Sequence, residues 1–145
     1  MKPYLSIILP SIRPHRLVSL YHSITASTSR SFELIICGPY PLPDELRDIK
    51  NIKYVKDYGS PVRASNIAAS LCEGEVCTWI ADDCLLFENA LERCIEEFES
   101  MGDETTNVLV SKYYEGQDNS VDRSTLQNDN YFKINGSPAA SPYIP

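Results

Sequence analysis

Short apolar runs alternate with helix-forming segments along roughly the first hundred residues, and this alternation constrains the fold more than any other feature. The runs are rich in β-branched residues and cover residues 4–9, 32–37, 52–55 and 76–80. Strands that are apolar throughout, with helices between them, form parallel sheets covered on both faces. The pattern predicts an α/β fold, a three-layer sandwich around a mostly parallel sheet.

The segments between these runs have helical spacing. Pro14 suits a first helical position, and Ser60-Pro61 opens a second helix. In that helix Val62, Ile67, Ala68 and Leu71 are expected to face the sheet, and Gly74 to close it in a left-handed conformation. A short helix is expected over residues 43–49, an amphipathic helix over 89–101 and a fifth strand over 107–114. The inner face of the amphipathic helix is expected to comprise Ala90, Leu91, Cys94, Ile95 and Phe98.

Composition excludes several classes of protein. A net charge of -7 argues against nucleic-acid binding, although Arg13, His15 and Arg16 form a small basic cluster suited to a phosphate. No apolar run approaches the roughly 18 residues of a membrane span, so we expect a cytoplasmic chain without a transmembrane segment. The five cysteines include no CxxC pair, which favours reduced thiols over a zinc site.

The character of the sequence changes near residue 115. Residues 117–130 are polar without periodicity, and residues 136–145 are rich in Pro, Ser and Ala. We therefore expect an α/β core over 1–115 and a separate segment over 116–145. A compact domain rarely ends on such a run, which suggests that the natural chain continues.

Asp82 and Asp83 are the strongest functional feature. In a parallel sheet, ligands bind beyond the carboxyl ends of the strands, where this pair follows the fourth run. Two adjacent carboxylates repel unless a cation or proton intervenes, and Mg²⁺ or Mn²⁺ shared with phosphate oxygens would relieve that repulsion. A solvated turn or a helix cap is the structural alternative.

Two further rim positions carry polar groups. Arg63 and Asn66 share a helical face near a helix start, where Arg can hold a diphosphate and Asn can bond a ribose or sugar. Their alternative is a solvated surface. Ser11 fits a helix cap better than a ligand, and His15 has a pKa suited to acid–base chemistry but lacks a supporting pattern.

Taken in order, the rim resembles the family 2 glycosyltransferases of the GT-A fold. The matching features are the opening strand with Pro10-Ser11, Asn66 eight residues before Gly74-Glu75, and Ala81-Asp82-Asp83 at the next strand end. The resemblance implies a nucleotide-sugar-binding core over 1–115 and the start of an acceptor-side segment over 116–145. The fold implied is GT-A-like, incomplete at its C-terminus.

The resemblance also implies roles for the rim residues in metal-dependent, inverting sugar transfer. Pro10 and Ser11 would line the base and ribose pocket, Asp82 would contact the ribose or sugar, and Asp83 would ligate Mn²⁺ or Mg²⁺. Arg63 would lie near the base or diphosphate. The donor would be a nucleoside-diphosphate sugar, with a UDP-sugar favoured, and the acceptor a glycan or a lipid-linked group, which could bring the chain to a membrane surface.

Two departures from the family pattern stand out. Cys37-Gly38-Pro39 replaces the acidic residue that usually follows the second strand. No general base can be assigned, although Asp118, Asp122 and Asp129 are available. A catalytically incomplete module that binds a nucleotide or a protein is therefore the alternative. Receiver-like domains and nucleotidyltransferases fit less well, because Pro10-Ser11 replaces the acidic residues of the first and Ser11-Ile12-Arg13-Pro14 lacks the Gly-rich loop of the second.

Overall fold

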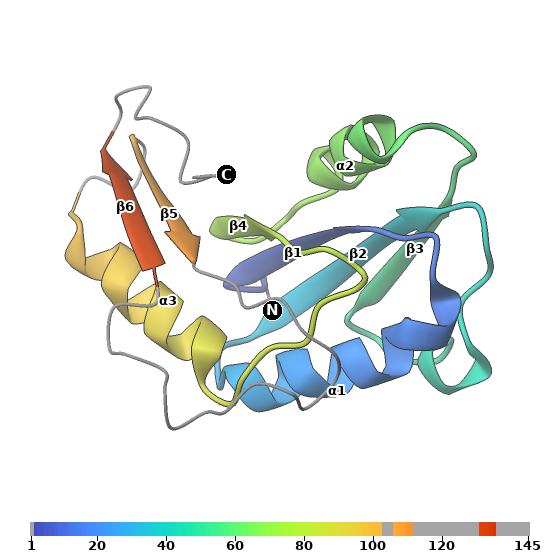
Figure 1. Ribbon diagram of the computed structural model, residues 1–145, viewed down its shortest axis with the longest axis horizontal. Coiled ribbons are helices and arrows are strands. Elements are labelled where there is room, and N and C mark those ends of the chain that lie inside the picture. The colour runs from blue at the N-terminus through green and yellow to red at the C-terminus, as the bar shows by residue number, and fades with distance from the viewer. Residues whose placement is uncertain (1, 103–105, 112–130, 136–145) are drawn as a thin grey trace. The chain divides into compact units, whose positions relative to one another are not determined.

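A computed structural model describes residues 2–102, 106–111 and 131–135. The chain divides into two compact units, Met1–Leu91 and Glu92–Pro145. The first unit contains a four-stranded parallel sheet in the order β3-β2-β1-β4 (Figure 1). Its strands are β1 (Leu5–Pro10), β2 (Phe32–Gly38), β3 (Ile52–Lys56) and β4 (Val76–Trp79). The predicted α/β class with a parallel sheet is confirmed here, and the arrangement is compatible with a Rossmann-like sandwich.

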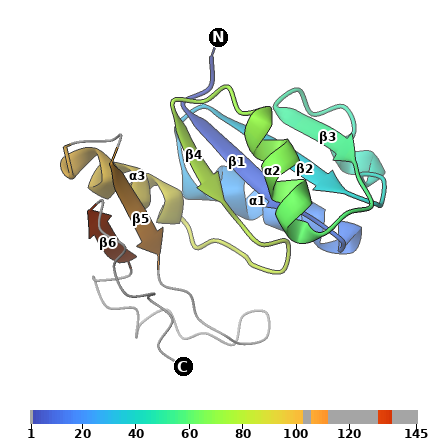
Figure 2. The same cartoon turned by 90° about the horizontal axis from the view of Figure 1, so that it is seen from above.

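One helix covers each face of this sheet (Figure 2). The turn η1 (Pro14–Arg16) leads into α1 (Leu17–Ser27) on one face, and α2 (Pro61–Ser70) covers the other. Alternate strand residues point to opposite faces. The α2 face therefore carries Ile8, Ile35, Cys37 and Val55, which pack with Ala64 and Ala68 of α2.

The orientation of α2 differs from the one expected. Ala64 and Ala68 are buried, whereas Val62 is 71% exposed and Leu71 is also exposed, so the prediction that these two face the sheet was wrong. Small side chains let the helix lie close to the sheet, and this decides which face turns inward. Ser60 caps the helix by accepting a hydrogen bond from the Arg63 amide at 3.3 Å.

Gly74 is required for a different reason from the one predicted. Its φ is not positive, and α2 ends four residues earlier, at Ser70. A Cβ at Gly74 would lie 2.6 Å from the Ser6 backbone nitrogen. Glycine therefore allows the turn after α2 to approach β1, and the expected left-handed cap was wrong.

Two local expectations are also corrected. β4 ends at Trp79 and lies at the edge of the four-stranded sheet, with Cys77 and Trp79 exposed, so it is not covered on both faces. The helix expected over residues 43–49 is the single turn η2 (Asp44–Leu46).

The second unit has its own small sheet. The helix α3 (Ala90–Ser100) crosses the boundary between the units, and its Leu91 and Ile95 are buried, as its amphipathic pattern predicts. β5 (Asn107–Ser111) pairs antiparallel with β6 (Tyr131–Asn135). The strand predicted over residues 107–114 is present as β5, and it belongs to this antiparallel pair rather than to the parallel sheet. Residues 112–114 lie outside the described residues. Among the described helices, none has the length and apolar character needed to cross a bilayer.

Candidate functional site

The strand order places a topological switch point at the carboxyl ends of β1 and β4. From β1 the chain passes to β2 and then β3 on one side of β1, and it returns to the other side as β4. In open α/β sheets, ligands bind beyond the strand ends at such a point. The two loops that meet here are residues 10–13, which follow β1, and residues 81–83, which follow β4.

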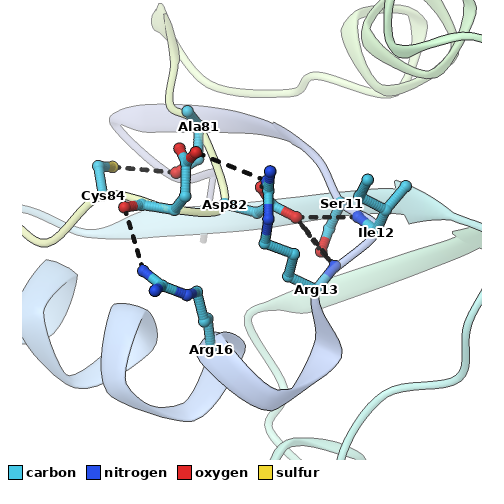
Figure 3. A network of polar contacts seen from close by, with 8 residues as sticks. Ser11, Ile12, Arg13, Arg16, Ala81, Asp82 and Cys84 are labelled. Carbon is cyan, nitrogen blue, oxygen red and sulfur yellow. Dashed lines mark hydrogen bonds and ion pairs between the residues drawn. The ribbon is translucent and has the colours of Figure 1, made fainter.

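Asp82 joins these two loops (Figure 3). Its Oδ2 accepts hydrogen bonds from the Ser11 hydroxyl at 3.1 Å, the Ile12 amide at 2.9 Å and the Arg13 amide at 3.0 Å. Its Oδ1 accepts one from Arg13 Nη1 at 2.5 Å. With only 5% of the residue exposed, Asp82 holds the turn after β1 in a fixed conformation.

The electrostatics of Asp82 follow from these bonds. Burial alone would raise the pKa of its carboxyl, but hydrogen bonds from Ile12, Arg13 and Ser11 outweigh that effect, so the pKa lies below its ordinary value. Asp82 is therefore a carboxylate at neutral pH.

Asp83 occupies a different environment. Both aspartates lie in a turn after β4 rather than in the strand itself. The Asp83 side chain is 52% exposed, and its Oδ2 lies 3.6 Å from Arg13 Nη1. The Arg13 guanidinium thus contacts both carboxylates and supplies the positive charge that two adjacent carboxylates require. Arg16 Nη1 also donates to the Asp83 backbone oxygen, at 3.4 Å.

The segment after β2 packs against the same turn. The Ser11 amide donates to the Cys37 oxygen at 2.9 Å. A Cβ at Gly38 would lie 1.8 Å from the Ser11 carbonyl oxygen, so no larger residue fits without moving the backbone. Gly38 therefore has a packing role at this turn.

Arg63 and Asn66 belong to a second group of residues at the start of α2. Arg63 makes an ion pair with Asp57, with Nη2 and Nε at 3.0 and 3.1 Å from Oδ1. Asp57 also accepts from the Gly59 amide at 2.9 Å, which fixes the loop between β3 and α2. Asn66 is exposed. The structure therefore brings Ser11, Arg13, Asp82 and Asp83 into one network, while Arg63 contacts Asp57.

The remaining predicted rim residues are placed as follows. Pro10 is half-buried at the end of β1, and His15 is exposed on η1. The ion pair of Asp57 with Arg63 and the bond from Arg16 to the Asp83 carbonyl were not predicted. Arg16 was expected only as part of the basic cluster with Arg13 and His15. The possible bases Asp118, Asp122 and Asp129 lie outside the described residues.

Cys84 lies beside the aspartates, but its chemistry does not fit a nucleophile. Burial, followed by the charge of Asp83, raises the pKa of its thiol to about 11. The thiol donates to the Ala81 oxygen at 3.0 Å. It therefore stays protonated at neutral pH, whereas the reactive form of cysteine is the thiolate.

Neither metal-ligand geometry nor comparison with other proteins identifies the function of this site. Within the described part of the chain, no group of three His, Cys, Asp or Glu side chains is placed to hold a metal ion. No protein-family model and no curated protein sequence matches this chain. The geometry of the rim is therefore the basis for a functional proposal.

Proposed function

We propose that the complete protein is an inverting glycosyltransferase whose first unit binds a nucleoside-diphosphate sugar. The observation that carries this proposal is the juxtaposition of Arg13 and Asp83 at the switch point, anchored by Asp82. A diphosphate needs positive charge close by, and a cation that accompanies it needs at least one carboxylate. Arg13 supplies the positive charge and Asp83 supplies the carboxylate.

The chemistry of these groups suits a donor that carries its own cation. A magnesium ion in a nucleotide site usually takes one or two protein carboxylates and fills its other positions with phosphate oxygens and water. The half-exposed carboxylate of Asp83 could supply one such ligand. When bound, Mn²⁺ or Mg²⁺ would neutralise charge on the departing diphosphate.

The chain's own residues would act by positioning and by charge. Asp82 holds the turn, so the backbone that carries Arg13 is in place before a ligand arrives, which lowers the entropic cost of binding. Arg13 has 41% of its side chain exposed and can turn from Asp83 toward a phosphate. The acceptor hydroxyl, on a glycan or a lipid-linked group, would displace the diphosphate once a base outside the described residues takes its proton.

Calorimetry on the purified chain tests the donor site. UDP, GDP, dTDP and CDP are each titrated with and without Mn²⁺, and the experiment is repeated with Asp83→Asn. We expect metal-dependent binding of one nucleotide, with UDP favoured, and a loss of at least about tenfold in affinity in the variant, equivalent to about 1.4 kcal/mol. Glu73→Gln is a matched control, because Glu73 is an exposed carboxylate that lies outside the rim network.

A catalytically incomplete binding module is the second candidate, and one observation favours it. Arg13 already makes an ion pair with both Asp82 and Asp83 within the protein, which partly offsets their repulsion without a metal. If a folded sample binds no nucleotide with or without Mn²⁺, the donor-site proposal fails and this second candidate gains support.

A further inference from the structure

Exposed apolar side chains lie at the carboxyl end of the first unit's sheet, the end that also carries the rim network. Ile12 follows β1, Tyr40 follows β2 and Tyr58 follows β3, and all three are exposed. Val62, at the start of α2, is exposed as well. Single exposed apolar residues are common on protein surfaces, whereas a group of them at one end of a sheet is typical of a ligand-binding surface.

Tyr58 offers a flat aromatic surface whose position is set by its neighbours. Lys56, two residues earlier, places Nζ 5.3 Å from the centre of the Tyr58 ring, a cation–π contact that restricts the ring. The Asp57 side chain accepts from the Gly59 amide at 2.9 Å and pairs with Arg63, which holds the backbone on both sides of Tyr58. With 76% of Tyr58 exposed, most of this ring is open to a ligand.

The strand order sets the separation between Tyr58 and the charged groups of the rim. Tyr58 follows β3 and Arg13 follows β1, with β2 between these two strands. Neighbouring strands lie about 4.8 Å apart, so the two loops are separated by about 10 Å across the sheet. A nucleoside diphosphate has a comparable reach from its base to its terminal phosphate. β2 ends between the two loops at Gly38, which adds no side chain to this path.

Two carboxylates near this path are already bonded within the protein. The Asp57 side chain is 10% exposed and pairs with Arg63, and Asp82 is buried with its donors. Neither is open to accept a hydrogen bond from a base. Stacking on an aromatic ring remains as a way to hold the base, and it is available to every base because each has a π face.

We propose that the Tyr58 ring stacks on the nucleobase of the donor while Arg13 and Asp83 hold its diphosphate and cation. This inference rests on the proposed function and adds to it the residue that holds the base. Because stacking tolerates different bases, Tyr58 contributes affinity for the nucleoside more than choice among bases.

Calorimetry with the whole chain tests this proposal. UDP, GDP, dTDP and CDP are each titrated with Mn²⁺, and inorganic pyrophosphate with Mn²⁺ serves as the diphosphate without a base. Tyr58→Ala should weaken binding of the preferred nucleotide by about tenfold and leave the affinity for pyrophosphate unchanged. Tyr58→Phe keeps the ring and should bind normally. Asp83→Asn should weaken the binding of both ligands.

A second tyrosine provides a matched control. Tyr4 precedes β1 at the amino end of the sheet, and Arg30 lies 5.0 Å from the centre of its ring. Tyr4→Ala therefore removes a similar aromatic–cation pair away from the rim and should not alter nucleotide affinity. Nucleotide binding that Tyr58→Ala leaves unchanged, or that Tyr4→Ala weakens equally, would overturn the stacking proposal and leave the donor site standing. Failure of the wild-type chain to bind any nucleotide would overturn both.

Discussion

Two buried carboxylates occupy opposite ends of the same sheet, and their surroundings differ in one respect. At the carboxyl end, Asp82 ties the turn after β1 to the loop after β4. At the amino end, Glu33 accepts from Ser6 Oγ at 2.5 Å, the Glu73 amide at 2.7 Å and Lys53 Nζ at 2.7 Å. Each carboxylate therefore has several donors and one basic partner.

The basic partners distinguish the two ends. Lys53 also contacts the Glu73 carboxylate at 3.1 Å and donates to the Leu71 oxygen at 3.3 Å, so its bonding capacity is filled within the protein. Arg13 shares its guanidinium with Asp83, which remains half exposed. The charged groups of the amino-end network therefore bond to one another within the protein, which is typical of a structural network. At the rim, Arg13 and Asp83 form a charged pair that a ligand can reach.

The largest effect is expected from Glu33→Ala. The substitution leaves Lys53 and the Glu73 amide without their buried acceptor, and breaking such a pair costs about 3–4 kcal/mol. Urea unfolding measures the change, with Glu73→Gln as the exposed control at about 0.5 kcal/mol or less. Nucleotide affinity of the folded fraction should not change. A large loss of affinity would show that the two ends are coupled.

Gly38→Ala should have the next largest effect. Its Cβ would meet the Ser11 carbonyl, so the rim backbone must shift, at about 2–3 kcal/mol. Unlike the Glu33 variant, it should also weaken nucleotide binding, because the turn at Ser11 moves. Gly74→Ala clashes with Ser6 at the other end and serves as the matched comparison. Equal affinities in the two alanine variants would contradict a ligand site at the rim.

Acidification should weaken both networks together. Burial alone would raise the pKa of Glu33, but hydrogen bonds from Lys53, Ser6 and the Glu73 amide outweigh burial, so the pKa lies below its ordinary value. The pKa of Asp82 is also below its ordinary value. A depressed pKa stabilises the fold above the unfolded-state value and loses that effect as the pH falls through the folded-state value. Stability should drop below about pH 4. The Glu33→Gln, Asp82→Asn double variant should show a flatter profile in unfolding experiments between pH 2 and 7.

The smallest effect on stability is expected from Asp83→Asn. Its side chain is half exposed and its ion pair is long, so the free energy of unfolding should change by about 0.5 kcal/mol or less. The same variant should lose metal-dependent nucleotide binding. A destabilisation comparable to that of Glu33→Ala would place Asp83 among the structural residues.

Much of the first unit could be predicted from the sequence. The four apolar runs lie within a residue or two of the observed strands. In the central strands β1 and β2, burial on both faces leaves a continuous hydrophobic signal. It is harder to predict which strands pair with each other. The run at 107–111 has the composition of a strand, but nothing in it distinguishes pairing with β6 from joining the parallel sheet.

The polar networks escaped prediction for a related reason. Glu33 lies inside an apolar strand, where an unpaired charge is costly, and this could have prompted a search for a basic residue on a neighbouring strand such as Lys53. The bond from Arg13 to Asp82 joins residues 69 apart in sequence. Its existence depends on β4 lying beside β1, which local patterns do not specify.

The strand order has a consequence for synthesis on the ribosome. β1 is central in the finished sheet, yet one of its two neighbours is made only when residues 76–79 appear. β1, β2 and β3 can pair earlier, since they are complete by residue 56. Until β4 arrives, β1 presents an apolar edge that can pair with another chain. The emerging polypeptide is therefore most prone to aggregation while those twenty or so intervening residues are being added, and a slow stretch of translation there would prolong that risk.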